Sequence, residues 1–124
     1  MDTTLPARTV PVHAADAAPD SEPCCDVELT IGMDSTRAST LADRLKALAD
    51  PTRLRMLNLL AEQSEALCVC EITNQFTLHQ PTISHHLRIL REAGLIRGEK
   101  RGTWSYYEAT AEGRRSLSIV RTLT

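Results

Sequence analysis

The sequence has no apolar run long enough to cross a membrane and no segment typical of a secretory signal. No stretch approaches 18 consecutive apolar residues, and the opening "MDTTLPARTVPVHAADAAPD" has neither a basic start nor an apolar h-region. We therefore expect a cytoplasmic protein with no membrane partner. Its 124 residues, 42% of them hydrophobic, suit one domain with a modest core and some unpacked tail.

Cysteines are few, but all four stand in two tight pairs. Cys24 and Cys25 are adjacent in "EPCCDV", and Cys68 and Cys70 lie two apart in "LCVCEI". Thiols stay reduced in the cytosol, so soft-ion binding explains the pairs better than a disulfide framework. The chain lacks a C-x-x-C motif and a Gly-rich phosphate loop, which argues against a thiol oxidoreductase or an arsenate reductase. We expect no enzyme.

An excess of positive charge is absent overall, yet the charge is polarised along the chain. The net charge is −2, but residues 1–79 carry 6 Lys/Arg against 12 Asp/Glu, whereas residues 80–124 carry 8 against 4. A basic C-terminal section on an acidic chain is compatible with a local phosphate-facing surface.

The apolar pattern divides the chain into two parts. Residues 1–37 show no sustained apolar period, which predicts a flexible N-terminal arm carrying one cysteine pair. In residues 38–124 we expect a helix from about Ser39 and, after Asp50 and Pro51, a second helix through "TRLRMLNLLAE". A last amphipathic helix is expected at about residues 111–123.

The stretch between these helices has the pattern of a helix-turn-helix followed by a wing. In "PTISHHLRILREAG" Ile83, Leu87 and Leu90 form an apolar stripe, and Gly94 ends the helix. The next stretch, "LIRGEKRGTWSYYEAT", alternates on both sides of "KRG" and predicts a two-stranded hairpin. The predicted fold is mostly α with a small β-hairpin, a winged helix-turn-helix.

The runs "LKALADPTRLRMLNLL", "CVCEI", "QPTISHHLRILREAGLI" and "RGTWSYYEAT" resemble the ArsR/SmtB family of winged-helix metal-sensing repressors, over about residues 38–123. The resemblance implies a homodimer joined through the first and last helices. It also implies operator binding in the ligand-free state, release by a toxic metal or metalloid, and an inducer-binding role for "CVC". Zinc-sensing relatives carry His and acidic ligands on the last helix, but this segment has a single Glu and no His, Asp or Cys.

Soft thiolates select trivalent arsenic or antimony, Cd(II) or Pb(II) over hard cations. A helix start near Cys68 or Cys70 would bring the two sulfurs together, and its dipole predicts lowered thiol pKa values. Arsenite needs three thiolates, and no third cysteine lies nearby, so we expect Cys24 or Cys25 to supply it from the same or the partner subunit. A vicinal cysteine pair could also clamp methylarsenite, which needs only two.

We therefore predict a repressor that needs no cofactor and is induced by arsenite, methylarsenite or antimonite, with Cd(II) or Pb(II) as the alternative. The other interpretations are a thiol-redox sensor, a DNA-binding module without a ligand, and cysteines that are merely buried core residues.

His86 is expected to be partly packed. The residues expected to contact operator DNA are Gln80, Thr82, Ser84, His85, Arg88, Lys100 and Arg101.

Overall fold

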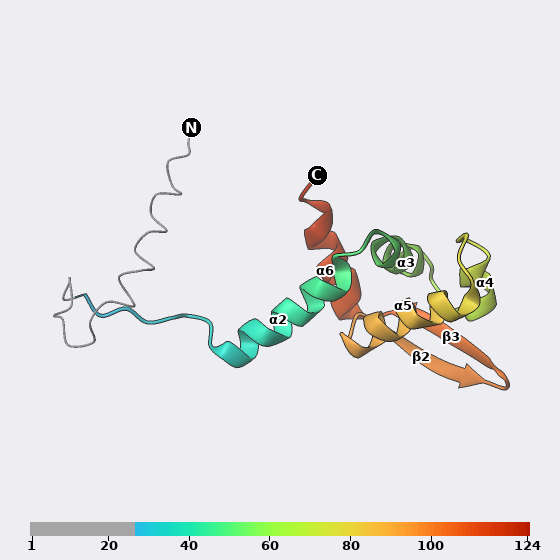
Figure 1. Ribbon diagram of the computed structural model, residues 1–124, viewed down its shortest axis with the longest axis horizontal. Coiled ribbons are helices and arrows are strands. Elements are labelled where there is room, and N and C mark those ends of the chain that lie inside the picture. The colour runs from blue at the N-terminus through green and yellow to red at the C-terminus, as the bar shows by residue number, and fades with distance from the viewer. Residues whose placement is uncertain (1–26) are drawn as a thin grey trace. The chain divides into compact units, whose positions relative to one another are not determined.

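The first helix, α2, begins four residues before the expected start at Ser39. In the computed structural model, which describes residues 27–124, α2 spans Ser35–Leu48 (Figure 1). The Asp34 carboxylate accepts a hydrogen bond from the Arg37 backbone N–H at 2.8 Å, and this cap fixes the start of the helix. The division into an arm of residues 1–37 and a domain of residues 38–124 stays a prediction.

A capped turn separates α2 from the next helix, as the sequence predicts. Helix α3 spans Pro51–Ala61. The Asp50 carboxylate accepts a hydrogen bond from the Arg53 backbone N–H at 3.0 Å, and Pro51 occupies the first turn, where no N–H is needed.

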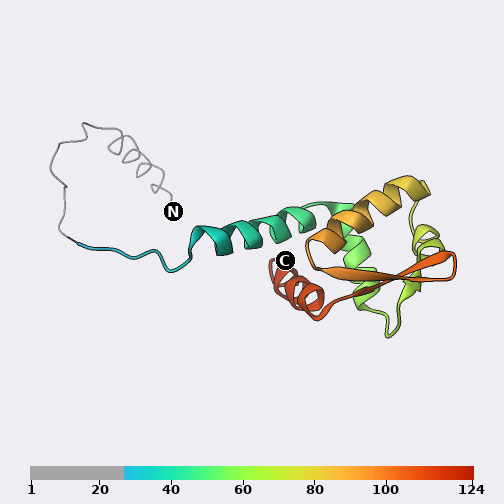
Figure 2. The same ribbon diagram turned by 90° about the horizontal axis from the view of Figure 1, so that it is seen from below.

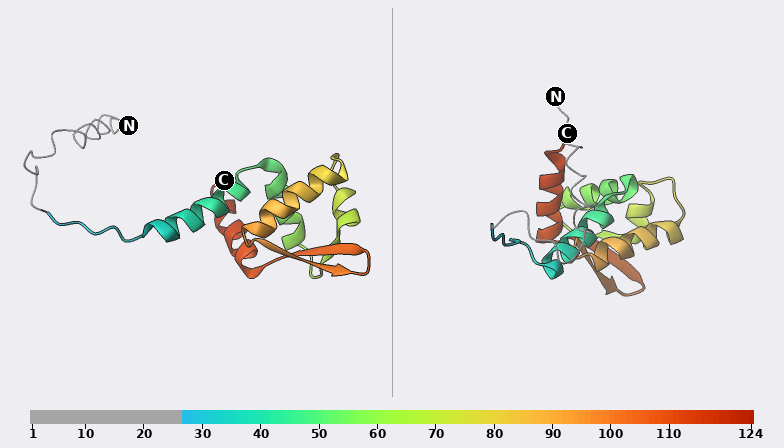
Figure 3. Two further views of the ribbon diagram at one scale, coloured as in Figure 1. Left: turned by 60° about the horizontal axis from the view of Figure 1, so that its bottom comes forward. Right: turned by 60° about the vertical axis from the view of Figure 1, so that its left-hand side comes forward.

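Two further helices form the predicted helix-turn-helix. Helix α4 is short, Val69–Thr73, and α5 spans Gln80–Glu92. The predicted apolar stripe of α5 is fully buried. Gly94 follows α5 with a φ of 78°, which a glycine adopts without strain. Figure 3 shows α5 lying along the β-sheet, with α4 near its N-terminal end.

The predicted hairpin is present and closes through a two-residue turn. Strands β2 (Ile96–Arg101) and β3 (Trp104–Ala109) are antiparallel, and Gly102 in the turn has a φ of 68°. The closed end of the hairpin projects from the helical part of the molecule (Figure 2). This hairpin is the wing.

A short strand that the sequence did not reveal pairs with the free edge of β3. Strand β1 consists of Leu67–Cys68, and the sheet order is β1-β3-β2. A two-residue strand is too short to show an alternating pattern, so pattern reasoning could not separate it from the helix that follows. Strand β1 joins the cysteine-bearing segment to the wing.

The last helix, α6, spans Ala111–Arg121 and packs against the start of the wing. The Thr110 hydroxyl caps it by accepting a hydrogen bond from the Gly113 backbone N–H at 3.0 Å. A side chain at Gly113 would collide with the Leu95 carbonyl. Only glycine at this position lets α6 pack this closely against the backbone of Leu95.

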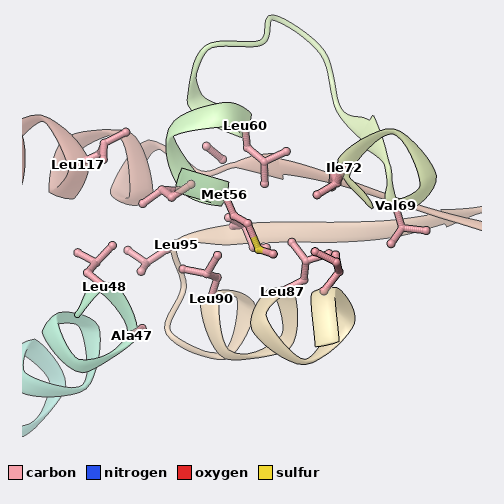
Figure 4. Close-up of a cluster of buried hydrophobic side chains, with 14 of the residues drawn as sticks. Ala47, Leu48, Met56, Leu60, Val69, Ile72, Leu87, Leu90, Leu95 and Leu117 are labelled. Carbon is pink, nitrogen blue, oxygen red and sulfur yellow. The ribbon is translucent and has the colours of Figure 1, made fainter. Parts of the chain in front are cut away.

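One hydrophobic core joins these elements (Figure 4). Helix α3 is central, because it contacts α2, α5, α6 and β3. The structure confirms the predicted winged helix-turn-helix. The fully buried side chains are those of Met56, Leu57, Leu60, Ile72, Ile83, Leu87, Leu90, Leu95 and Ile96.

Candidate thiol site and nucleic-acid interface

The two central cysteines lie at the junction between β1 and α4. Cys68 ends the strand and is the N-cap of the helix, while Cys70 lies in its first turn. Their Sγ atoms are 2.9 Å apart, and neither forms a disulfide. Residues two apart inside a helix would point to different faces, so the strand-to-helix junction is what brings the sulfurs together. The helix therefore begins next to Cys68, which is the condition under which the sequence predicts that the two sulfurs meet.

Backbone hydrogen bonds hold this junction in place. The Glu71 carboxylate accepts a hydrogen bond from the Cys68 backbone N–H at 2.8 Å, and the Cys70 backbone N–H donates to Cys68 Sγ at 3.4 Å. Cys68 is buried, whereas Cys70 is exposed. A soft ion can therefore reach the pair from the Cys70 side, with one sulfur already fixed by the fold.

The pKa of Cys70 is raised above the ordinary thiol value. The main cause is the hydrogen bond with the Cys68 thiol; partial desolvation adds to it, as do negative charge on Cys68 and Glu71. The prediction of lowered thiol pKa values is wrong for Cys70. Helix α4 has only five residues, so its dipole is small, and the Glu71 carboxylate lies at the same helix start.

The two sulfurs form an incomplete donor set within the described part of the chain. Among residues 27–124 no group of three or more His, Cys, Asp or Glu side chains is arranged to hold a metal ion. The other two predicted ligands, Cys24 and Cys25, lie outside the described residues. Two thiols suit a ligand that forms two sulfur bonds, and any ion needing three or four must take donors from elsewhere.

The exposed face of α5 carries the predicted base-reading groups. Arg88 Nη2 lies 3.1 Å from His85 Nδ1, which links two of these side chains along the helix. Hydroxyl, amide and imidazole groups on one helix face can form hydrogen bonds to base edges, and an arginine beside them can contact phosphate. The predicted contact residues of this helix are all exposed: Gln80, Thr82, Ser84, His85 and Arg88.

The wing presents Lys100 and Arg101 next to its turn, and both are exposed. Arg101 Nε donates to a Glu99 carboxylate oxygen at 2.8 Å, and its guanidinium carbon lies 4.4 Å from the centre of the Tyr106 ring. The Glu99 carboxylate raises the pKa of Arg101 further above its usual range. Sequence reasoning missed Glu99 and Tyr106, although the alternating pattern of the hairpin places both on the same face as Arg101.

His86, the second histidine of "SHHL", is half-buried, as expected. Its Nδ1 lies 3.2 Å from Arg53 Nη1. Arg53 Nε also donates to the Ala47 carbonyl at 2.7 Å, so this arginine connects α2, α3 and α5. Sequence reasoning gave Arg53 no role, because nothing in the local pattern indicates these contacts.

Residues 50–97 match the model of the bacterial regulatory protein arsR family. An HTH-type transcriptional regulator of Methanocaldococcus jannaschii is 52% identical over 66 residues, which are 53% of this chain and 73% of that protein. The arsenical resistance operon repressor of Bacillus subtilis is 41% identical over 83 residues, 64% of this chain and 78% of that protein. The chain belongs to the arsR family.

The fold comparison agrees with the arsR assignment. The solution structure of a homodimeric winged helix-turn-helix DNA-binding domain from Mycobacterium bovis is 28% identical, with a TM-score of 0.64, over 76% of this chain and 89% of that one. This arsR-family protein is therefore a transcriptional repressor with a DNA-binding fold and not an enzyme. Its described helices are all too short or too polar to span a bilayer.

Proposed function

We propose that this arsR-family repressor binds operator DNA through α5 and the wing, and releases it when a trivalent arsenical or antimonite binds Cys68 and Cys70. The observation that carries the proposal is the pair of sulfurs 2.9 Å apart at the β1–α4 junction. Its repressor relative from Bacillus subtilis is named for arsenical resistance. Soft sulfur ligands favour the same class of ion.

The number of sulfurs decides which inducer fits. Methylarsenite retains its methyl group and forms two As–S bonds, so Cys68 and Cys70 alone can hold it. Arsenite and antimonite form three bonds, and Cys24 or Cys25 supplies the third sulfur in our proposal, from the same chain or from the partner subunit. Cd(II) or Pb(II), with both cysteine pairs as ligands, is the alternative.

The proposed assembly is a homodimer joined through α2 and α6. These helices border a common apolar groove, lined by Leu41, Leu48 and Val120 among others. Two large apolar side chains of these helices are exposed, Leu45 by 60% and Ile119 by 63%, and Leu123, two residues after α6, is exposed by 81%. The Mycobacterium bovis neighbour is homodimeric. A second copy would cover this surface and place two recognition helices on one operator.

The experiment that tests the inducer is a release titration. Operator-bound protein is titrated with arsenite, methylarsenite, antimonite, Cd(II), Pb(II) and Zn(II), and DNA release is followed by fluorescence anisotropy. We expect release by the trivalent species. A Cys24→Ser/Cys25→Ser double variant should lose sensitivity to arsenite and retain sensitivity to methylarsenite.

The other outcomes separate the alternatives. Release by Cd(II) and Pb(II) but not by arsenicals would show that the inducer is one of these divalent ions. Release by a disulfide-forming oxidant alone would identify a thiol-redox sensor. No release by any of these would leave a DNA-binding module without a ligand and would contradict the proposal.

A further inference from the structure

One row of side chains crosses the sheet from the thiol site to the wing. In the register of the sheet Cys68 on β1 lies opposite Tyr106 on β3, and Tyr106 lies opposite Glu99 on β2. Directly opposite residues of antiparallel strands have their side chains on the same face, with Cβ atoms about 4.5–5.5 Å apart. Tyr106 is thus the immediate neighbour of the buried cysteine on one side and of a wing carboxylate on the other.

The same tyrosine supports the arginine of the wing. Arg101 follows Glu99 by two residues, so its side chain is on the same face, and its guanidinium lies over the Tyr106 ring at 4.4 Å. Helix α4 contacts β3 directly. Lys100 belongs to the opposite face of the hairpin and has no such connection to the row.

Building on the proposed function, we propose that Tyr106 is a positioning residue that couples the thiol site to the wing. In the ion-free protein its ring holds the Arg101 guanidinium where it can meet an operator phosphate. Ion binding at Cys68 shifts β1 against β3 and removes this support. The wing therefore loses the Arg101 contact during release.

The geometry of ion binding supplies the displacement. Two thiolates bonded to one ion at about 2.3 Å, with an S–ion–S angle of about 90–110°, are about 3.3–3.8 Å apart, whereas the two sulfurs here are 2.9 Å apart. Binding must separate them and add an ion next to the buried Cys68 sulfur. Tyr106 is the residue directly opposite Cys68 across the two strands, so the change reaches β3 first.

The test compares the two basic residues of the wing tip. Arg101→Ala and Lys100→Ala each remove one exposed positive charge, so both should weaken operator binding and lower the salt slope by about 0.9. The quantity of interest is the release factor, the ratio of the operator Kd with and without saturating arsenite. Arg101→Ala should lower the release factor about 2- to 5-fold, the worth of one exposed cation–π contact. Lys100→Ala should leave it unchanged.

A second pair of variants tests the tyrosine itself. Tyr106→Leu removes the ring and should lower both the salt slope and the release factor as Arg101→Ala does. The Tyr106→Leu/Arg101→Ala double variant should show no further loss of either quantity. Tyr106→Phe keeps the ring and should behave as the unmodified protein. The arsenite affinity of the free protein, measured separately, should be the same in both tyrosine variants. If Tyr106→Leu only distorted the thiol site, its arsenite affinity would be lower.

Two results would overturn the inference, and they are distinct from failure of the proposed function. If arsenite releases the unmodified protein and Arg101→Ala retains the full release factor, Tyr106 does not couple the two sites and the proposed function stands. The same holds if Arg101→Ala and Lys100→Ala lower the factor equally. If no thiophilic ion releases the unmodified protein, the proposed function itself fails and this inference fails with it.

Discussion

Cys68 and Cys70 differ in environment although only one residue separates them. The first is buried and fixed by β1, while the second is exposed and has a raised pKa because of its hydrogen bond with the first. Near neutral pH the Cys70 thiol therefore remains protonated. An ion that binds as a bare cation must displace protons, whereas As(OH)₃ condenses with thiols and releases water.

This difference predicts that the two inducer classes depend differently on pH. Cd(II) affinity should rise with pH, by up to about tenfold per pH unit for each proton released between about pH 6 and 8. Arsenite affinity should change little over the same range. Binding titrations of the free protein at several pH values measure both. A Cd(II) affinity independent of pH would show that the thiols are already ionised.

In the proposed operator complex Glu99 competes with DNA phosphate for Arg101. The carboxylate holds the Arg101 guanidinium at 2.8 Å in the free protein and adds negative charge to the wing tip. Glu99→Gln should lower the operator Kd about 2- to 5-fold at low salt, since an exposed ion pair competes only weakly. Anisotropy titrations measure the change.

The matched control for this prediction is Glu108→Gln. Glu108 forms the same kind of pair with Arg97 at 2.8 Å, but at the end of the hairpin away from the turn. Glu108→Gln should change the operator Kd less than Glu99→Gln does. Equal effects of the two substitutions would indicate a general change in net charge and no local competition at Arg101.

At the scale of elements, the caps set where the helices begin. The pKa of Asp50 is lowered, chiefly because its carboxylate accepts the Arg53 backbone N–H. A lowered pKa in the folded state means that the cap stabilises the fold above the unfolded-state pKa and loses this effect as the pH falls through the folded-state pKa. Asp50→Ala should reduce the free energy of unfolding by about 1 kcal/mol at pH 7.

Urea unfolding at two pH values checks this prediction. The difference between the unmodified protein and Asp50→Ala should shrink as the pH falls below the unfolded-state pKa of about 3.9 and through the lowered folded-state pKa of Asp50. Asp50→Asn keeps a capping oxygen and should retain most of the stability at pH 7 with a weaker acid dependence. A constant difference at all pH values would mean that Asp50 acts through packing and not through its charge.

The elements with a clear local sequence pattern could be predicted. Those that depend on contacts with residues far away in the sequence could not. Helix α5 and the wing follow from apolar periodicity and glycine positions. The first turn of α2 is exposed on all sides and so has no apolar period, which hid its start. Strand β1 exists only because β3 lies beside it.

The candidate site shows the same division. The cysteine spacing was sufficient to predict that the sulfurs meet if a helix begins between them. The direction of the Cys70 pKa was not predictable, because it depends on the orientation of Cys68 and Glu71 in the folded chain. The role of Tyr106 required the strand register, which links residues far apart in the sequence.

At the scale of the whole molecule, the α2 and α6 surface should determine the oligomeric state. Leu45→Asp places a charge in the exposed apolar surface, and we expect a monomer in size-exclusion chromatography with light scattering. Operator affinity should fall about 10²-fold or more, because one recognition helix loses the avidity of two. Ser39→Asp adds the same charge to an exposed polar part of α2 and should leave the dimer intact. A dimeric Leu45→Asp protein would contradict this interface.

The most direct test of the central claim is arsenite release of operator DNA from Cys68→Ser and Cys70→Ser variants. Serine preserves the size of the side chain but replaces a soft sulfur with a hard, protonated oxygen that thiophilic ions reject. Both variants should bind operator with unchanged affinity in the absence of arsenite and should no longer be released at concentrations that free the DNA from the unmodified protein. Normal release of Cys68→Ser, together with failed release of the Cys24→Ser/Cys25→Ser protein, would place the inducer site in the N-terminal segment and contradict the account.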